Sequence, residues 1–459
     1  MAHAHQMQTQ GQSVKVHSDD SLPTGGALSL RDRLLLDTGG LLALRVAYGG
    51  LSFVLTIILA RTLGTEGFGT YSYSFAWTVL LGVPAILGMD QLLIREIAAY
   101  RVRSQWHLIR GLLRMANSLV LMVSVGLALI AAIFVWFLRA RWAPQMAPTF
   151  WLSLLLLPLI SLTRVRQGAL QGMQQVVLGS IPERLIQPTL LLGFVGVVSW
   201  KLNTMSPPLV MGMNIVAALV AFAIGARWLQ QTLPLSIKQV EPAYRNSGWL
   251  RSAFSMLLFS SVSVVFSQAD LLILGAVKGA HAVGLYSVAD RGAEMLTIMM
   301  AAQSGAFAST AAALYATRDI ETLQRLATRI ARWNLLITLP LTAIFVFFGE
   351  WILLHIYGVQ FTPARESLAI LSLGQLVNVA MGLNAFLLIM TGHEAQAATA
   401  LGGGAVANIV LNVLLVPTWG MEGAAIGNAC SVVLWNVLAT FALYRKTGIH
   451  STVFVASPH

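Results

Sequence analysis

Residues 59–72 read LARTLGTEGFGTYS, and residues 274–287 read LGAVKGAHAVGLYS. Aligned without a gap, the two stretches are identical at five positions, where Leu59, Gly64, Gly69, Tyr71 and Ser72 fall on Leu274, Gly279, Gly284, Tyr286 and Ser287. Each stretch closes one long apolar run and opens another. The pattern predicts one helical hairpin that occurs twice in the chain.

The composition around these stretches is that of a membrane protein. Hydrophobic residues make up 56% of the 459 residues and charged residues 10%, whereas a soluble domain typically carries about 25% charge. Mean hydropathy is +0.73. A helix needs about 20 apolar residues to cross the hydrocarbon core, whereas a membrane β-barrel shows alternating segments of about 10 residues. The apolar runs here are long and do not alternate, so we expect an all-α polytopic membrane protein.

The apolar runs predict twelve transmembrane helices. They lie near residues 40–60, 70–90, 113–138, 148–165, 184–200, 207–228, 253–276, 283–308, 333–354, 365–390, 396–417 and 422–443. The longest polar linker follows the sixth run and separates two lobes of six helices. We divide the chain into a cytoplasmic tail (1–38), an N-terminal lobe (39–228), a linker (229–252), a C-terminal lobe (253–445) and a second tail (446–459).

Six helices per lobe make the repeat parallel, related by an axis along the membrane normal. Two further matches agree with the duplication. Asn117 matches Asn334, and Gly172 matches Gly392, at nearly the same separation in the chain as the two opening stretches. Such internal repeats are frequent in transporters, whose two halves rock about a site between them.

The basic residues predict the orientation of the helices. Of 29 Lys and Arg residues, this assignment of spans puts 21 in loops or at span ends on one side and 6 on the other, and Arg45 and Arg291 lie deeper within spans. Because cytoplasmic loops carry the excess of Lys and Arg, both termini are expected in the cytoplasm. The net charge of +11 then reflects membrane topology rather than binding to nucleic acid. We expect the outer Arg61 and Lys278 to snorkel toward lipid head groups.

Three stretches resemble a known family. They are ARTLGTEGFGTYSYSFAWT at 60–78, GMDQLLIREIA at 88–98 and NIVLNVLLVPTWGMEGAAIGNA at 408–429. The last one carries an N-x-x-x-N…P-x-x-G-x-x-G-A pattern at Asn408, Asn412, Pro417, Gly420, Gly423 and Ala424. Over residues 40–445 the chain resembles bacterial oligosaccharide flippases of the polysaccharide-transporter type, which share a superfamily with multidrug exporters. In physical terms, Pro417 and Gly420 predict a tight turn, and the small residues that follow allow close helix packing.

Five charged residues lie inside predicted spans, where each costs about 2.5–3.5 kcal/mol to insert. Arg45 either reaches the head groups or contacts a diphosphate. Arg291 and Glu294, three residues apart, can form an ion pair beside Asp290. Asp270 either pairs with Arg291 or binds a coupling proton or cation.

The repeat provides a comparison for these charges. In the alignment of the two copies, their counterparts are Ser260, Leu55, Phe75, Ala76 and Val79, none of which is charged. The shared scaffold therefore does not require the charges, and we place the function where the two lobes differ.

The resemblance implies a plasma-membrane flippase that moves a lipid-diphosphate-linked oligosaccharide to the outer leaflet by alternating access. Arg45 and Arg291 would bind the diphosphate, and Asp270, Asp290 and Glu294 would serve coupling or ion pairing. The expected partners are the lipid-linked oligosaccharide, the bilayer and polysaccharide polymerase machinery. No cofactor or metal is expected, and a proton or sodium ion is the candidate coupling ion.

Two other functions stay open. One is a cation-coupled multidrug exporter of the same superfamily, for which an acidic, aromatic cavity would be typical. The other is a membrane-embedded glycan polymerase or ligase, an enzyme that would need a large outer loop. The predicted outer loops hold about ten residues or fewer, and we find no catalytic motif in them. The single cysteine, Cys430, excludes an internal disulfide.

Overall fold

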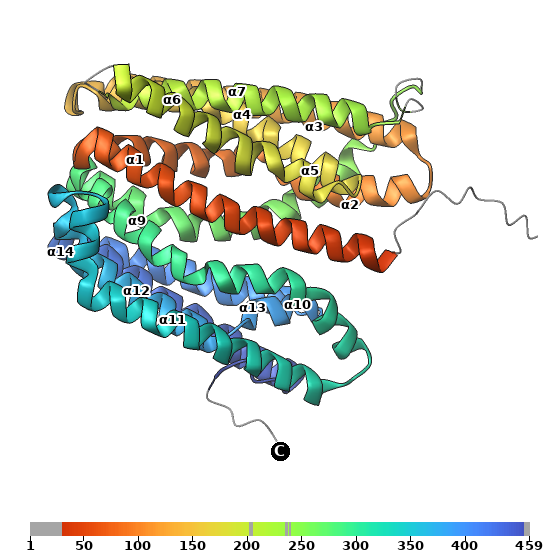
Figure 1. Ribbon diagram of the computed structural model, residues 1–459. Coiled ribbons are helices and arrows are strands. Elements are labelled where there is room, and N and C mark those ends of the chain that lie inside the picture. The colour runs from red at the N-terminus through yellow and green to blue at the C-terminus, as the bar shows by residue number, and fades with distance from the viewer. Residues whose placement is uncertain (1–29, 202–204, 235–236, 238–239, 454–459) are drawn as a thin grey trace, which may run out of the picture.

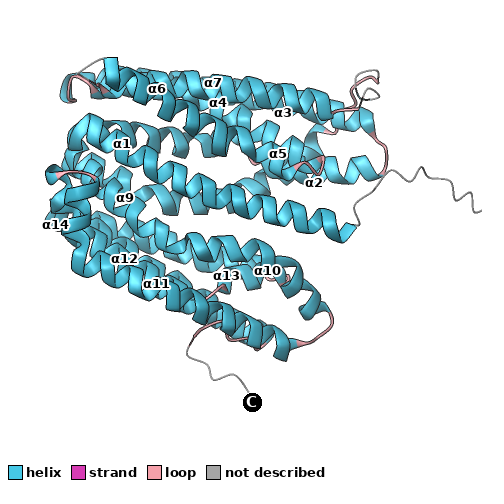
Figure 2. Cartoon of the chain, viewed as in Figure 1, coloured by secondary structure: helices cyan, strands magenta, loops and turns pink. Residues whose placement is uncertain are grey.

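The computed structural model describes residues 30–201, 205–234, 237 and 240–453. Within these residues the chain is almost entirely helical and has no strand (Figure 2). The α-helices are α1 (Leu30–Ile86), α2 (Met89–Val102), α3 (Trp106–Leu138), α4 (Met146–Gly172), α5 (Val176–Ile181), α6 (Gln187–Lys201), α7 (Pro207–Thr232), α9 (Asn246–Glu294), α10 (Ile298–Ala316), α11 (Ile320–Ile356), α12 (Arg365–Met381), α13 (Asn384–Met390) and α14 (Glu394–Thr447).

Short turns join several of them. A π-helical turn, η2 (Pro182–Ile186), continues α5 into α6, and 3-10 turns lie at η1 (Arg139–Arg141), η3 (Met295–Thr297) and η4 (Val359–Ala364). Helix α1 begins at Leu30, inside the segment expected to be a tail. Residues 1–29 and 454–459, which make up most of the two expected tails, lie outside the described part of the chain.

The number of membrane crossings agrees with the prediction. In the described residues, nine helical segments are long and apolar enough to cross a membrane. Three of them are divided near the middle by a glycine with non-helical backbone angles, namely α1 at Gly64, α9 at Gly279 and α14 at Gly420, whereas Gly382 lies only eight residues before the end of its segment. Dividing these three at their glycines turns nine segments into twelve. The protein is therefore an all-α, multi-pass membrane protein.

The duplicated stretches form the same backbone turn. Gly64 has φ 68° and ψ −178°, and Gly279 has φ 82° and ψ −177°. Only glycine adopts such positive φ values without strain, because other residues carry a Cβ atom. Gly420, in the third interrupted helix, has φ 59° and ψ −130°, in agreement with the turn expected there. Two of the turns thus fall on matched positions of the repeat.

The two halves of the chain lie on opposite sides of the molecule. Figure 1 shows α1–α7 above and α9–α14 below, and the contact between α1 and α9 is the most extensive between any two helices. We call the end with Gly64, Gly279 and Gly420 the kink end. The opposite end, which holds the α2–α3 and α10–α11 turns, is the arginine-rich end.

The closest approach of the halves is backbone against backbone. A Cβ atom on Gly69 would lie 1.7 Å from the carbonyl oxygen of Ala280, and one on Gly284 would lie 2.0 Å from that of Thr65. Gly69 and Gly284 occupy the same position in the two copies of the repeat. Small residues allow such close contact between membrane helices. The repeat therefore provides both surfaces of this contact.

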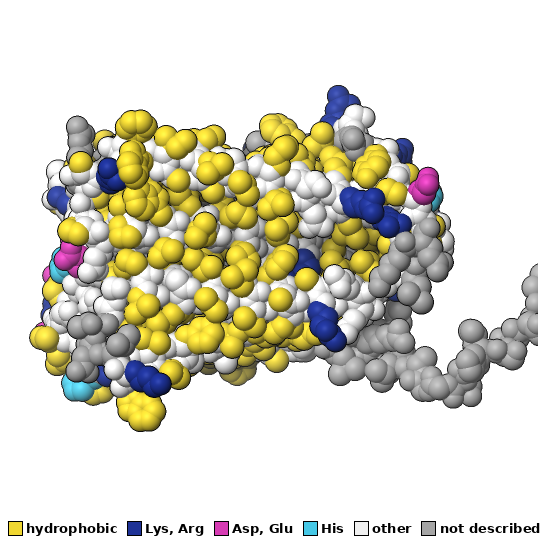
Figure 3. Space-filling model, turned by 90° about the horizontal axis from the view of Figure 1, so that it is seen from above, with side chains coloured by type: hydrophobic (Ala, Val, Ile, Leu, Met, Phe, Trp, Pro, Cys, Tyr) yellow, Lys and Arg dark blue, Asp and Glu magenta, His cyan; other side chains and the backbone are white. Residues whose placement is uncertain are grey.

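The outer surface is suited to lipid. Seen from above, the middle of the molecule is covered largely by hydrophobic side chains, and charged side chains lie toward the two ends (Figure 3). Exposed residues on this kind of surface include Ile130 and Phe134 of α3 and Phe347 of α11. Because hydrocarbon offers no hydrogen bonds, an apolar belt between polar ends is the arrangement that a bilayer requires.

We expect Gly279→Ala to destabilise the protein by about 1–3 kcal/mol, because alanine is strained at this positive φ. A Cβ atom at Gly279 meets nothing within 4 Å, so the backbone angle alone would cause the loss. Gly402→Ala is the matched control, since Gly402 also has open space but lies within helix α14. Thermal unfolding in detergent should show a lower midpoint for the first variant only. Equal midpoints would contradict this account of the turn.

Candidate functional site

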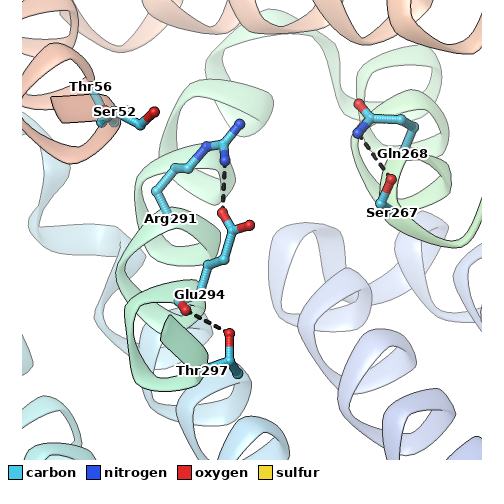
Figure 4. A network of polar contacts seen from close by, with 7 residues as sticks. All are labelled: Ser52, Thr56, Ser267, Gln268, Arg291, Glu294 and Thr297. Carbon is cyan, nitrogen blue, oxygen red and sulfur yellow. Dashed lines mark hydrogen bonds and ion pairs between the residues drawn. The ribbon is translucent and has the colours of Figure 1, made fainter. Parts of the chain in front are cut away.

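Arg291 and Glu294 form an ion pair in the last turn of α9. The Arg291 Nη1 atom lies 2.7 Å from Glu294 Oε2, and the two side chains are 47% and 60% exposed. Figure 4 shows them facing the space between α1, with Ser52 and Thr56, and the first part of α9, with Ser267 and Gln268. At these exposed fractions the pair is not enclosed by the described part of the chain.

Three arginines from both halves lie within electrostatic range of Tyr48 of α1, and Arg45 lies within range of one of them. Tyr48 interacts electrostatically with Arg164, Arg184 and Arg291, and Arg184 is in turn repelled by Arg45. Tyr48 is 40% exposed, and the Arg45 side chain is exposed as well. We call Arg45, Arg164, Arg184 and Arg291 the arginine cluster. It contains Arg45 and Arg291, which were expected to bind the diphosphate, together with Arg164 and Arg184, which were counted only as basic residues of the cytoplasmic side.

Arg164 and Arg184 were counted on the cytoplasmic side, at the ends of the predicted spans 148–165 and 184–200, and the structure places both in helical segments. Arg164 lies within α4, where it is 3.4 Å from Glu183, and Arg184 lies in the π-helical turn η2. Hydropathy ends a span where charges begin, so a helix that continues through charged residues is shortened in such a prediction. Arg166, also counted on the cytoplasmic side, is buried in α4 and donates to the carbonyl of Phe222 at 2.6 Å.

Asp270 is a buried carboxylate held by neutral donors. Its exposure is 3%, and it accepts hydrogen bonds from Tyr286 Oη at 3.0 Å, Asn412 Nδ2 at 2.7 Å and Asn428 Nδ2 at 2.5 Å. Arg291 pairs with Glu294 instead, so the Asp270–Arg291 pair considered from the sequence is not the arrangement found. Asp290, next to Arg291 in the second part of α9, interacts electrostatically with Asp270, Arg291 and Glu294.

The asparagines around Asp270 come from the third sequence motif. Asn412 also donates to Asn408 Oδ1 at 2.7 Å, so both residues of the N-x-x-x-N pattern belong to this cluster. Sequence reasoning assigned the motif a packing role and missed this one. Their spacing of four residues, which puts both on one helix face inside an apolar run, was the available signal.

One oxygen in this cluster has no hydrogen-bond partner. Asn412 Oδ1 is buried and unpartnered among the described residues. The neighbouring Asn408 Nδ2, a buried donor, is also without a partner among the described residues, so the asparagines offer Asp270 more hydrogen-bonding capacity than they use. In the described part of the chain, no group of three or more His, Cys, Asp or Glu residues could hold a metal ion.

Hydrogen bonds close the kink end between the halves. Arg61 of α1 donates through Nε to the carbonyl of Ile356 at 2.7 Å and through Nη2 to that of His355. Thr65 Oγ1 lies 3.0 Å from His281 Nδ1. The last carbonyls of a helix have no partners within it and carry partial negative charge, which attracts a cation. Arg61 therefore joins the halves instead of snorkelling.

Lys278, the second residue expected to snorkel, also bonds to backbone. Its Nζ atom donates to the carbonyl of Pro417 at 2.9 Å, which connects the turns at Gly279 and Gly420. Arg61 and Lys278 thus both stabilise the kink end. We call the Arg61 and Thr65–His281 contacts, together with Gly69 and Gly284, the kink-end contact.

Comparison with known proteins identifies the family of this chain and the fold that it shares with other transporters. The profile of a family described as "Polysaccharide biosynthesis protein" matches residues 35–316. The "Probable low-salt glycan biosynthesis flippase Agl15" of Haloferax volcanii is 24% identical over 231 residues. That alignment covers 49% of this chain and 47% of the relative, so the chain spans about half of that protein's length.

Solved structures share the fold at low sequence identity. An inward-facing multidrug resistance MATE family transporter of the MOP superfamily aligns with TM-score 0.70 and 14% identity, covering 89% of this chain and 98% of its own. A MOP superfamily transporter from Pyrococcus furiosus, reported with a binding pocket of reversed polarity, aligns with TM-score 0.64 and 13% identity over 91% and 96% of the chains. The fold is that of MOP superfamily transporters, and by its sequence the chain belongs to the polysaccharide biosynthesis protein family.

Proposed function

We propose that this protein is a flippase that moves a lipid-diphosphate-linked oligosaccharide from the inner to the outer leaflet of the plasma membrane. The observation that carries the proposal is the arginine cluster, which draws accessible cations from both halves into one place. The family's description and the name of the Haloferax relative fit the same role. Polysaccharide polymerase machinery would then use the delivered oligosaccharide.

The chemistry of the arginine cluster suits a diphosphate. Guanidinium groups pair with phosphate oxygens through two parallel hydrogen bonds, and each charge-assisted bond contributes about 1.5–3 kcal/mol. Glu183 and Glu294 neutralise Arg164 and Arg291 while no ligand is bound. A diphosphate would replace the two carboxylates as the partner of these guanidiniums, and the displaced carboxylates would face water.

Alternating access supplies the transport step. The kink-end contact closes one end, whereas the accessible arginines lie toward the other. In this scheme the arginine-rich end faces the cytoplasm, together with both termini, and the halves rock as two lobes about the contact of α1 with α9. Breaking the kink-end contact would expose the oligosaccharide to the outer side while its lipid tail stays in the bilayer.

Asp270 is our candidate for energy coupling, with Asp290 and Glu294 nearby. Its neutral donors stabilise the charged carboxylate, and a proton or sodium ion would change its charge without leaving an unpaired cation. Tyr286 and Asp270 lie on the two sides of the Gly279 turn, so a change at the carboxylate would act on that hairpin.

A multidrug exporter is the second candidate, because several fold neighbours carry that name. Asp270 would serve such an exporter as well. The arginine cluster would repel the cationic drugs that an acidic cavity attracts, so the charges favour an anionic substrate. A membrane-embedded polymerase or ligase has no supporting feature in the described residues.

We expect Arg164→Ala and Arg291→Ala each to slow translocation about tenfold or more, because each removes charge-assisted bonds to the diphosphate. Arg45→Ala tests the remaining arginine from α1. The control is Arg139→Ala, since Arg139 stacks on Trp136 at 3.4 Å, beyond the end of α3. Transfer of a lipid-linked oligosaccharide across reconstituted vesicles measures the rate. Unchanged rates in all three cluster variants would overturn the substrate assignment.

Linking Thr65→Cys to His281→Cys should arrest transport, because the kink end must open in each cycle. The native Cys430 is exposed, so the pair is made in a Cys430→Ser background. We expect oxidation to stop translocation and a reductant to restore it, whereas oxidised single-cysteine variants keep working. Undiminished transport by fully cross-linked protein would refute alternating access at this contact.

Asp270→Asn should fold yet lose ion dependence, because the amides of Asn412 and Asn428 can rotate to pair with it. Asp270→Leu removes the acceptor of Tyr286 Oη and Asn428 Nδ2, at about 1–3 kcal/mol for each lost bond, and should lower the unfolding midpoint markedly. Glu350→Gln is the control, as Glu350 is exposed and pairs with Arg365. Transport under imposed proton and sodium gradients reports coupling. Ion dependence that persists in Asp270→Asn would exclude this residue as the coupling group.

A further inference from the structure

A groove with a volume of about 400 Å³ lies on α11, outside the candidate functional site. It is lined by Arg325, Thr328, Arg329, Arg332, Trp333 and Leu336. Helix α11 packs against α10, α12 and η4 in the C-terminal half, whereas the arginine cluster lies on α1, α4, η2 and α9. The transport mechanism therefore does not use these arginines.

The tryptophans of α11 show how deep this groove lies in the membrane. Trp333 and Trp351 are 58% and 59% exposed and stand eighteen residues apart, which is about 27 Å along a helix. That distance is close to the roughly 30 Å of the hydrocarbon core. Leu336 and Phe347 between them are 62% and 80% exposed. Since tryptophan concentrates at membrane interfaces, Trp333 marks one interface, and the arginines before it lie at the level of the lipid head groups.

The groove carries an excess of positive charge on one helix face. Arg325, Arg329 and Arg332 follow one another at four and three residues, so their side chains line up. Arg325 lies 3.3 Å from Glu321, and Arg332 Nε is 3.4 Å from the carbonyl of Val453. Arg329 is exposed and forms no ion pair in the described part of the chain. The residues that line the groove thus include three guanidiniums and no carboxylate.

The N-terminal half has a groove at the matched place. It measures about 320 Å³ and is lined by Arg114, Met115, Ser118, Leu119, Met122 and Tyr244. In the register that aligns Asn117 with Asn334, Met115 and Leu119 fall on Arg332 and Leu336 of the α11 groove. Both halves therefore have a groove at the matched position, but only the α11 groove is lined by three arginines.

We propose that the α11 groove binds the head group of an anionic glycerophospholipid. The guanidiniums of Arg329 and Arg332 would hold the phosphate, since arginine pairs with phosphate oxygens in a bidentate manner. Trp333 would lie beside the glycerol and ester groups, and the acyl chains would follow Leu336 toward the membrane centre. Basic pockets at the cytoplasmic side of membrane helices recognise anionic head groups in this way.

The test compares phosphatidylglycerol with phosphatidylcholine on the purified full-length protein in detergent, with bound lipid counted by native mass spectrometry. We expect wild type to retain phosphatidylglycerol selectively, and Arg329→Gln combined with Arg332→Gln to bind it about tenfold more weakly. Arg329→Gln alone, which breaks no ion pair, should reduce binding about threefold. The controls Arg365→Gln, near the opposite interface, and Arg114→Gln, in the other groove, should change it less than twofold.

Two outcomes would overturn the proposal. One is equal binding of phosphatidylglycerol by wild type and the double variant while both remain folded by thermal unfolding. The other is preferential retention of undecaprenyl diphosphate over phosphatidylglycerol at this groove, which would make it a substrate site. Because translocation does not enter this measurement, its result is independent of the proposed flippase activity.

Discussion

The backbone contact between Gly69 and Gly284 is the constraint on which the rest of the structure depends. At these two positions the halves approach so closely that even a methyl group would overlap a carbonyl oxygen of the other half. Gly64 and Gly279 lie five residues before Gly69 and Gly284. They turn the backbone so that the second helix of each hairpin reaches the contact. The remaining helices of each half pack behind α1 and α9. One duplicated stretch therefore makes both the turns and the surface at which they meet.

Close packing at the kink end determines where polar groups can stand. With the backbones touching there, Arg61 and Lys278 at this end bond to carbonyl groups, and the arginine cluster lies elsewhere, on α1, α4, η2 and α9. Asp270 occupies a different environment, enclosed by Tyr286 and the asparagines of α14 within the C-terminal half. The two halves share a backbone design and differ in buried charge. The same division holds at the surface, where matched grooves on α3 and α11 differ in their arginines.

Local sequence patterns predicted the helices and turns well and the contacts between helices poorly. Twelve crossings and the turns at Gly64, Gly279 and Gly420 followed from runs of apolar residues and from glycine spacing. Arg164 and Arg184 were not among the expected site residues, because hydropathy cannot show that a helix continues through charged residues or that a π-helical turn bridges two helices. The contact of Asn412 with Asp270 spans 142 residues and depends on how α9 and α14 are rotated toward each other. Arg61 was expected to face lipid, since its sequence neighbours say nothing about the end of α11.

The amino-acid sequence by itself determined the membrane environment, the number of crossings, the family and the positions where the backbone turns. These depend on hydrophobicity and on positive φ angles, which are properties of short segments. Only the tertiary structure decided which polar groups come together: the arginine cluster near Tyr48, three donors around Asp270, and Arg61 on the last carbonyls of α11. Such contacts depend on the rotation and pairing of helices far apart in the chain. An apolar helix carries little record of those choices, because lipid and protein are almost equally suitable neighbours for its side chains.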